Sequence, residues 1–304
     1  MTPPIPFRKH YDLSLPVRHI PAGLAGYGRG LILGQRTVLM GILNITPDSF
    51  ADGGLRFDPS RAVEDGLQMI EDGAAILDVG GESTRPGAEP LDAAEELRRV
   101  LPVVERLARD QRVAVSIDTY KASVAREAIA AGAAIVNDIS GLQFDPDLAG
   151  VVAEAGAAIV LMHTRGRSRE MYQEAHYGDV VGEVTSELRA AIDRATSAGV
   201  RRESIVIDPG IGFAKRAEHS YQAIAGLSRI AAALDRPILV GPSRKSYLKA
   251  AVGDVPPSER EWGTAAAVAA SVLLGAHILR VHGVREMAQV VKVADQIRGD
   301  QPRG

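Results

Sequence analysis

The sequence contains no cysteine, so a disulfide framework, a cysteine nucleophile and a zinc site with cysteine ligands are excluded. It has no excess of positive charge either. Its 35 Lys and Arg against 38 Asp and Glu give a net charge of −3, which argues against binding nucleic acid through a global positive field. No uncharged apolar run reaches the roughly 18 residues of a membrane-spanning helix, and residues 1–16 lack the apolar stretch of a signal peptide. We therefore expect a cytoplasmic protein.

Aromatic residues are scarce, at 4%, whereas alanine and glycine are abundant, a composition that suits helices packed closely on a sheet. Short apolar runs alternate with longer segments of helical pattern. The expected strands are 38–44, 74–80, 113–118, 133–139, 157–163, 204–210, 237–243 and 276–282. The expected helices include 60–72, 92–109, 121–131, 179–198, 218–233 and 261–275. Most of the strand candidates lack alternation, as expected for strands buried on both faces of a parallel sheet.

Eight such strand–helix alternations favour a single-domain α/β fold, the (β/α)₈ TIM barrel, over a doubly wound open sheet. We assign the barrel to residues 31–297, with an N-terminal extension at 1–30 and a C-terminal tail at 298–304. The extension is rich in proline and glycine and reads as an added segment or as a hairpin that caps the bottom of the barrel. Asp92 and Ser220 are the expected N-caps of two helices.

Polar side chains gather at the C-terminal ends of the strand candidates. They are Asn44, Asp78, Glu82, Asp118, Asn137, Asp138, His163, Asp208, Ser243 to Ser246, Arg280 and His282. Each one singly has a plain interpretation as a turn former or helix cap, and for Asp78 and Asp138 that interpretation is as good as a functional one. In a barrel, however, these strand ends meet at one face, where active sites are built. The whole set therefore predicts an enzyme site.

Two connections, 46–60 and 81–91, are longer than ordinary βα turns, and a third, irregular stretch at about 164–177 follows the fifth strand. Loops of this length are often lids or binding loops. Five basic side chains near the expected site suit a phosphate or carboxylate: Arg85, Arg244, Lys245, Arg280 and His282. The strand residues Asp118, Asn137 and Asp208 suit a planar heterocycle with several N–H donors. A polar ring that carries a phosphate is the ligand that these residues indicate.

Eight motifs in order along the chain resemble those of the dihydropteroate synthase family, over roughly residues 38–297. They are MGILNITPDSFADGG (40–54), LDVGGESTRPGA (77–88), SIDTYKASVAREAI (116–129), GAAIVNDISG (132–141), LMHTRG (161–166), IVIDPGIGFAK (205–215), PILVGPSRKSYL (237–248) and ILRVHGV (278–284). The resemblance implies a (β/α)₈ barrel. It also implies a transferase of folate biosynthesis that condenses 6-hydroxymethyl-7,8-dihydropterin diphosphate with 4-aminobenzoate, releasing pyrophosphate and 7,8-dihydropteroate, with Mg²⁺ held beside the diphosphate. The family works through ionisation of the pterin C–O bond before the amine attacks.

The resemblance also implies roles for individual residues. The pterin site would consist of Thr84, Asp118, Asn137, Asp208 and Lys245. The diphosphate site would consist of Asn44, Arg280 and His282, with Asn44 also on Mg²⁺. The 4-aminobenzoate site would consist of Phe50, Thr84, Arg85, Pro86, Phe213 and Ser246. The residues expected to act directly in catalysis are Asp52, Arg85, Lys245 and Arg280.

Two positions depart from the family pattern: Thr164 stands where Met is frequent, and Gly283 stands where Asp often follows the histidine. Neither removes a matched functional residue. Two rival interpretations remain, a pterin-barrel methyltransferase domain and a catalytically silent paralogue that binds a pterin or a partner. The first would not need the Thr84–Gly87, Ser243–Ser246 and Arg280–His282 groups together. Members of the family are usually homodimers, and the small-residue, apolar segment 262–274 is a candidate interface.

Overall fold

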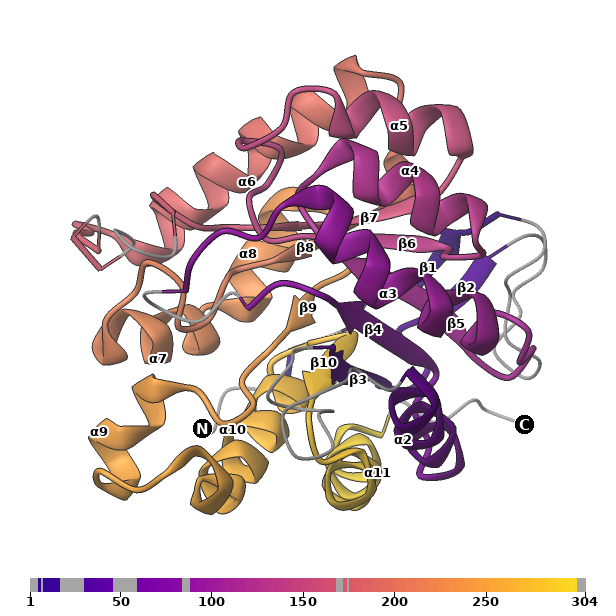
Figure 1. Cartoon of the computed structure of the whole chain (residues 1–304). Coiled ribbons are helices and arrows are strands. Elements are labelled where there is room, and N and C mark those ends of the chain that lie inside the picture. Colours follow the sequence, from indigo (N-terminus) through magenta and orange to yellow (C-terminus); the bar gives the residue numbers. More distant parts are fainter. Residues whose placement is uncertain are drawn as a thin grey trace.

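The computed structural model describes residues 5–6, 8–16, 30–45, 59–83, 88–167, 172–173 and 175–299, and it confirms the (β/α)₈ barrel (Figure 1). The barrel strands are β3 (Val38–Asn44), β4 (Ile76–Gly80), β5 (Ala114–Asp118), β6 (Ile135–Asp138), β7 (Ala158–Met162), β8 (Ile205–Asp208), β9 (Leu239–Val240) and β10 (Ile278–Val281). They are parallel, in the order β8-β7-β6-β5-β4-β3-β10-β9. A single bridge, Ile207 to Ile238, joins β8 to β9 and closes the barrel.

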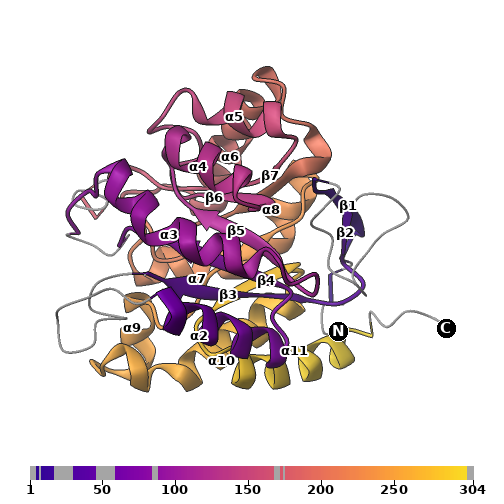
Figure 2. The same ribbon diagram turned by 45° about the vertical axis from the view of Figure 1, so that its right-hand side comes forward.

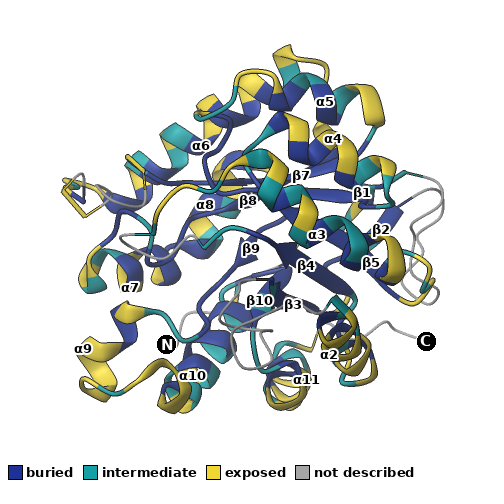
Figure 3. Ribbon diagram, viewed as in Figure 1, coloured by how far each residue is buried: buried dark blue, intermediate teal, exposed yellow. Residues whose placement is uncertain are grey.

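Helices surround the strands, with exposed residues on their outer faces (Figures 1 and 3). They are α2 (Pro59–Glu71), α3 (Ala93–Leu107), α4 (Ala122–Ala130), α5 (Leu148–Ala155), α6 (Val180–Ser197), α7 (Ala217–Ala225), α8 (Leu227–Leu234), α9 (Lys249–Val252), α10 (Glu261–Leu273) and α11 (Val284–Arg298), with 3₁₀ turns at Arg202–Ser204, Ser246–Leu248 and Pro257–Glu259. The helix expected at 218–233 is in fact two helices that meet at Gly226. A Cβ there would lie 2.4 Å from Val181 Cγ2, so glycine, a weak helix former, lets α6 approach closely. No helix within these described ranges is long and apolar enough to cross a membrane.

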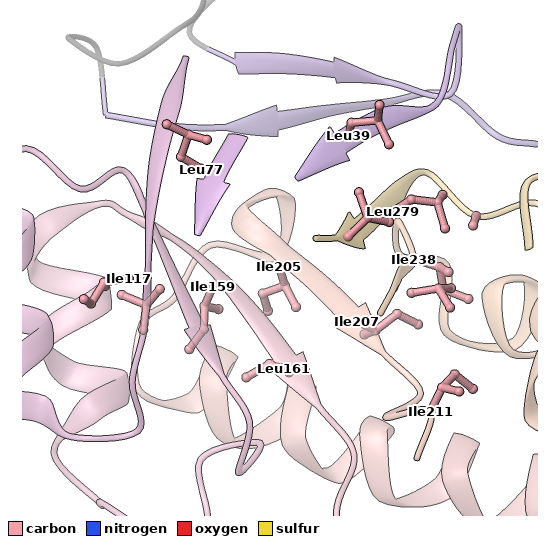
Figure 4. Packing of buried hydrophobic residues seen from close by; sticks show 14 of the residues in the cluster. Leu39, Leu77, Ile117, Ile159, Leu161, Ile205, Ile207, Ile211, Ile238 and Leu279 are labelled. Carbon is pink, nitrogen blue, oxygen red and sulfur yellow. The ribbon is translucent and has the colours of Figure 1, made fainter. Parts of the chain in front are cut away.

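Two apolar clusters, one on each face of the barrel wall, explain why the strand sequences show no alternation. In β7, Ala158 and Val160 belong to a cluster inside the barrel, whereas Ile159 and Leu161 pack outward against the helices (Figure 4). The same parity holds in β4, where Ile76 faces inward and Leu77 outward. Since the inward and the outward residues are both apolar, their alternation does not appear in the sequence as an apolar/polar pattern.

A two-stranded antiparallel hairpin, β1 (Tyr11–Ser14) and β2 (Gly30–Leu33), covers the N-terminal ends of the barrel strands (Figure 2). Its leucines Leu13, Leu15, Leu31 and Leu33 are fully buried and join the inner cluster with the first residues of the strands. The buried Arg8 fastens the segment before β1 to the barrel, because it donates to Thr37 Oγ1, the Ala276 carbonyl and Asp295 Oδ1. The hairpin thus closes the bottom of the barrel and leaves the opposite end for a site.

Of the two expected N-caps, one is confirmed and one is wrong. Asp92 precedes α3 and accepts a hydrogen bond from the Ala94 N–H at 3.3 Å. Ser220 lies inside α7, where its hydroxyl donates to the Arg216 carbonyl and accepts from the Gly212 N–H. Ser220 therefore fastens the loop after β8 and starts no helix.

Candidate active site

The strand register brings polar residues of neighbouring strands to one level at the C-terminal end of the barrel. Asn44 is paired with Gly80, Gly80 with Asp118, and Asp118 with Asn137. All of them share the parity of the inward-facing residues of their strands. Gly80 leaves a gap in this row: a Cβ there would lie 3.5 Å from Asp118 Oδ2 and 3.7 Å from Asn44 Oδ1. The two oxygens from different strands therefore face one small space.

Arg280 of β10 lies between two buried carboxylates. Its Nε donates to Asp78 Oδ2 and its Nη2 to Asp118 Oδ2, both at 2.6 Å. Asn137 Nδ2 donates to the same Asp78 oxygen at 2.9 Å. The second oxygens of the two carboxylates, Asp78 Oδ1 and Asp118 Oδ1, have no hydrogen-bond partner among the described residues. Because buried polar atoms rarely remain unpaired, this arrangement calls for a ligand that donates hydrogen bonds.

On the other side of the barrel mouth, the loop after β8 holds Asp208 and Lys245 together. Asp208 Oδ1 accepts from the Gly210 N–H at 2.7 Å, which fixes the start of the loop. Lys245 Nζ donates to the Ile211 carbonyl at 2.6 Å and lies 4.4 Å from the centre of the Phe213 ring. The glycine-rich sequence of the loop resembles a phosphate loop, yet the loop serves here to seat a lysine beside an aromatic ring.

The electrostatics of these groups follow from burial. Burial raises the pKa of Asp118, although Arg280 opposes the shift, and it raises the pKa of Asp208 against the attraction of Lys245. Burial lowers the pKa of Lys245 to about 8, opposed by Asp208. A lysine with such a pKa still carries most of its charge at neutral pH. Shifted groups that converge on one opening are typical of functional sites.

His282 and Ser243 form a small polar pair beside Arg280. Ser243 Oγ lies 2.9 Å from His282 Nδ1 and accepts the His282 N–H at 3.2 Å. Arg244, an expected anion contact, instead donates its Nε to Glu261 Oε2 at 2.7 Å. That ion pair joins Arg244 to α10, and the expected contact of Arg244 with an anion stays a prediction.

The described part of the structure brings together Asn44, Asp118, Asn137, Asp208, Phe213, Lys245, Arg280 and His282 at the barrel mouth, with Ser246 directly after Lys245. Ser246 is exposed, and its Oγ lies 3.2 Å from Tyr172 Oη. The remaining expected residues, Phe50, Asp52, Thr84, Arg85 and Pro86, lie outside the described residues.

Asp78 is the site residue to which sequence reasoning gave too little weight. It has the inward parity of β4, and its partner Arg280 comes from β10, on the far side of β3. Asp138 is the opposite case. Its carboxylate accepts from the Ser140 and Leu142 N–H groups, so its turn-forming interpretation is confirmed. Parity along the strand separates the two aspartates.

Comparison with known proteins agrees with this geometry. Residues 40–282 match the sequence profile of a family described as pterin binding enzyme. The chain is 46% identical over 264 residues to a dihydropteroate synthase of Synechocystis, covering 87% of this chain and 91% of that protein. It is 50% identical over 261 residues to a dihydropteroate synthase of Mycobacterium leprae, covering 84% of this chain and 91% of that protein.

Two solved structures of Xanthomonas albilineans dihydropteroate synthase are also similar. The one with 4-aminobenzoic acid has a TM-score of 0.81 at 41% identity and covers 88% of this chain and 95% of its own. The one in complex with 7,8-dihydropteroate has a TM-score of 0.79 at 38% identity and covers 88% of this chain and 96% of its own.

Proposed function

The chain belongs to the pterin-binding enzyme family, and on this premise we propose how its residues divide the work of the reaction. The reaction is that of a dihydropteroate synthase, a transferase of folate biosynthesis. It joins 4-aminobenzoate to 6-hydroxymethyl-7,8-dihydropterin diphosphate and forms 7,8-dihydropteroate and pyrophosphate. The observation that carries the division of roles is the pair of buried carboxylates with unpaired oxygens beside Arg280 at the barrel mouth.

The pterin ring is assigned to Asp118, Asn137, Asp208 and Lys245, with Asp78 as a further contributor from below. Pterin nitrogens are N–H donors, and the unpaired oxygens of Asp78 and Asp118 are acceptors with no other partner in the described structure. Carboxylates around the ring also stabilise positive charge that spreads into the ring as the diphosphate leaves. Thr84 is proposed as an additional contact.

The diphosphate is assigned to Asn44, Arg280 and His282. Asp78 and Asp118 fix the Arg280 guanidinium at two points, so it can meet a developing anion without reorganising. Mg²⁺ is proposed beside the diphosphate, with Asn44 as its protein ligand. The space next to Gly80, which Asn44 Oδ1 and an Asp118 oxygen face, suits an ion that is held by one or two protein oxygens and by substrate phosphate. When bound, Mg²⁺ neutralises charge on the leaving group.

The aminobenzoate is assigned to Phe213 and Ser246, together with Phe50, Arg85, Thr84 and Pro86. Phe213 offers an apolar face to the benzene ring, and Ser246 follows Lys245 at the outer rim. Arg85 and Asp52 are proposed to act in catalysis from the two long loops. Exclusion of water from the site would keep it from competing with the amine.

The proposed step begins when the bond between the pterin methylene carbon and the diphosphate oxygen breaks, and the electron pair leaves with pyrophosphate. The amine nitrogen of 4-aminobenzoate then attacks the methylene cation, and its extra proton passes to water. Lys245 and the carboxylates hold the ring in place, and Arg280 and His282 hold the leaving group. No covalent bond to the protein is needed.

The experiment that tests the function is an assay of the purified chain with dihydropterin diphosphate, 4-aminobenzoate and Mg²⁺. Pyrophosphate and dihydropteroate are expected together, and neither without 4-aminobenzoate. Binding of the pterin with no product would contradict the synthase function and favour a silent paralogue. Omission of Mg²⁺ with added chelator is expected to lower the rate strongly, and an unchanged rate would contradict the metal assignment.

A homodimer is proposed through α10 and α11, which lie side by side (Figure 1). Three large apolar side chains on these helices are exposed: Trp262 at 88%, Val293 at 61% and Ile297 at 59%. Exposed apolar surface of this kind is typical of interfaces. Sedimentation should give a dimer that Ile297→Glu weakens, and a monomeric wild-type chain would contradict the proposal. The cytoplasm is proposed as the place of the reaction, because a diphosphate ester does not cross a lipid bilayer unaided.

A further inference from the structure

A line of three buried or half-buried side chains lies directly behind Phe213, and the reaction as described does not use it. Lys215 Nζ lies 2.8 Å from His163 Nδ1, and His163 Nε2 lies 3.0 Å from Glu187 Oε2. Lys215 and His163 are only 1% and 3% exposed. The three residues come from the loop after β8, the end of β7 and helix α6. The line therefore connects three separate elements.

The direction of these hydrogen bonds is fixed. The Glu187 carboxylate can only accept, so the neutral imidazole carries its proton on Nε2 and donates it to Glu187, which leaves Nδ1 to accept from the Lys215 amine. Burial, reinforced by Lys215, lowers the pKa of His163 to about 4, so the imidazole is neutral at physiological pH. Arg165 Nε holds the other Glu187 oxygen at 3.1 Å. Glu187 is thus an anchor that keeps the imidazole in one orientation.

At the other end of the line, Lys215 binds the backbone of Phe213. Lys215 Nζ donates to the Phe213 carbonyl at 3.1 Å, while Lys245 Nζ donates to the Ile211 carbonyl of the same loop at 2.6 Å. The loop also lies tightly on the end of β7. Gly210 has a φ of +67°, and a Cβ there would be 1.9 Å from the His163 carbonyl oxygen. The two lysines and His163 therefore fix the backbone of the loop from Gly210 to Phe213.

Lys215 is a costly residue to bury. Its hydrogen-bond partners in the described structure are a neutral imidazole and a carbonyl, and burial lowers the pKa of Lys215 to about 7, so holding a charge there costs free energy. A methionine of similar length would fill the same space but would leave His163 Nδ1 and the Phe213 carbonyl without this donor. Polar groups that persist despite such a cost are more frequent at functional sites.

We propose that Lys215, His163 and Glu187 form a positioning unit that sets the place of Phe213 and thereby the binding of 4-aminobenzoate. The proposal rests on the proposed function, because it takes Phe213 as a contact of that substrate. Lys215 touches no reacting atom, so it is a positioning residue. Its loss should therefore disturb one substrate and spare the other.

The test compares Lys215→Met with Lys292→Met, an exposed lysine on α11. Lys215→Met is expected to raise the KM for 4-aminobenzoate about tenfold and to leave the Kd for dihydropterin diphosphate, measured by calorimetry, within about twofold. Lys292→Met should match the wild type in both. Wild-type turnover is measured first. If the wild-type chain makes no dihydropteroate, the proposed function is refuted, whereas the positioning role is judged only from the variants of an active chain.

A double-mutant cycle shows whether Lys215 acts through Phe213. Phe213→Ala should raise the aminobenzoate KM by itself, and adding Lys215→Met should then change KM less than about twofold. A Lys215→Met effect that persists in full in the Phe213→Ala background would overturn the proposal. So would a loss of pterin affinity as large as the rise in KM.

Two histidine variants keep the test decisive even if Lys215→Met does not fold. His163→Leu breaks the line and should raise the aminobenzoate KM, whereas His163→Gln offers an amide that can accept from Lys215 and donate to Glu187. Rescue of KM by glutamine, with equal thermal midpoints for both variants, supports a positioning role. Equal KM values for leucine and glutamine would contradict it.

Discussion

The two ends of the barrel bury charged side chains in opposite ways. At the bottom, the buried Arg8 guanidinium donates hydrogen bonds to four groups: the carbonyls of Gly34 and Ala276, the Thr37 hydroxyl and the Asp295 carboxylate. At the top, Asp78 and Asp118 share Arg280 and each keeps one oxygen without a partner in the described structure. A complete polar network stabilises a fold, whereas an incomplete one is kept where a ligand completes it.

The largest expected effect on activity comes from removing Arg280 from its network with Asp78 and Asp118. Arg280→Ala should lower kcat/KM about 10³-fold, the range for loss of a preorganised group that stabilises developing charge. The fold should survive, because Asp118, whose pKa burial already raises, can take up a proton when the cation is gone. Pyrophosphate release gives the rate and circular dichroism the fold, with the exposed Arg201→Ala as control. Near-normal turnover would refute the role of Arg280.

The matching change at the bottom should affect stability and spare catalysis. Arg8→Met removes the ion pair to Asp295, whose side chain is 15% exposed, and is expected to lower the free energy of unfolding by about 2–3 kcal/mol. The kcat/KM should stay within about twofold at a temperature where the variant is folded. Urea denaturation of Arg8→Met and of the exposed Arg109→Met gives the comparison. A large loss of activity in folded Arg8→Met would mean that the two ends are coupled.

A third change separates two roles of the Asp208 carboxylate, its proposed contact with the pterin and its hydrogen bond from the Gly210 N–H. Asp208→Ala should weaken dihydropterin diphosphate binding by about 10- to 100-fold, since a charged hydrogen bond is worth roughly 1.5–3 kcal/mol. Asp208→Asn keeps the oxygen that accepts the Gly210 N–H and should lose less. Calorimetry measures both variants beside the exposed Asp193→Ala. Unchanged affinity in Asp208→Ala would refute its contact with the pterin.

The smallest effect concerns pH. Burial lowers the pKa of Lys245 to about 8, so the amine is charged below that pH and neutral above it. The positive charge that Lys245 contributes to the site is therefore lost as pH rises, and the affinity for dihydropterin diphosphate should fall a few-fold between about pH 7 and pH 9. In Lys245→Met the affinity is lower throughout and this fall is absent. A wild-type fall that persists in Lys245→Met would contradict the assignment of the pH dependence to Lys245.

The parts of this molecule that are repetitive were predictable from the sequence. Each barrel strand lies inside its expected segment, because a strand buried on both faces reads as an apolar run with polar residues at its end. Asp118, Asn137 and Asp208 meet because parallel strands end at the same face, so their convergence needs no knowledge of side-chain contacts.

The parts that depend on a specific contact were not predictable. Ser220 resembles an N-cap but serves the loop after β8, and Arg244 resembles an anion contact but pairs with Glu261. Lys215 carries no sign in the sequence that it is buried against His163, a residue 52 positions away. Such partners come from different turns of the barrel, and local patterns carry no information about them.

The attachment of Arg8 has a consequence for the order of events during synthesis. Its partners Ala276 and Asp295 follow it by 268 and 287 residues. At about 5–20 residues per second, the segment that closes the bottom of the barrel waits on the order of tens of seconds for the helix that fastens it. All barrel strands are therefore synthesised before helix α11 is complete and before Arg8 can reach Asp295.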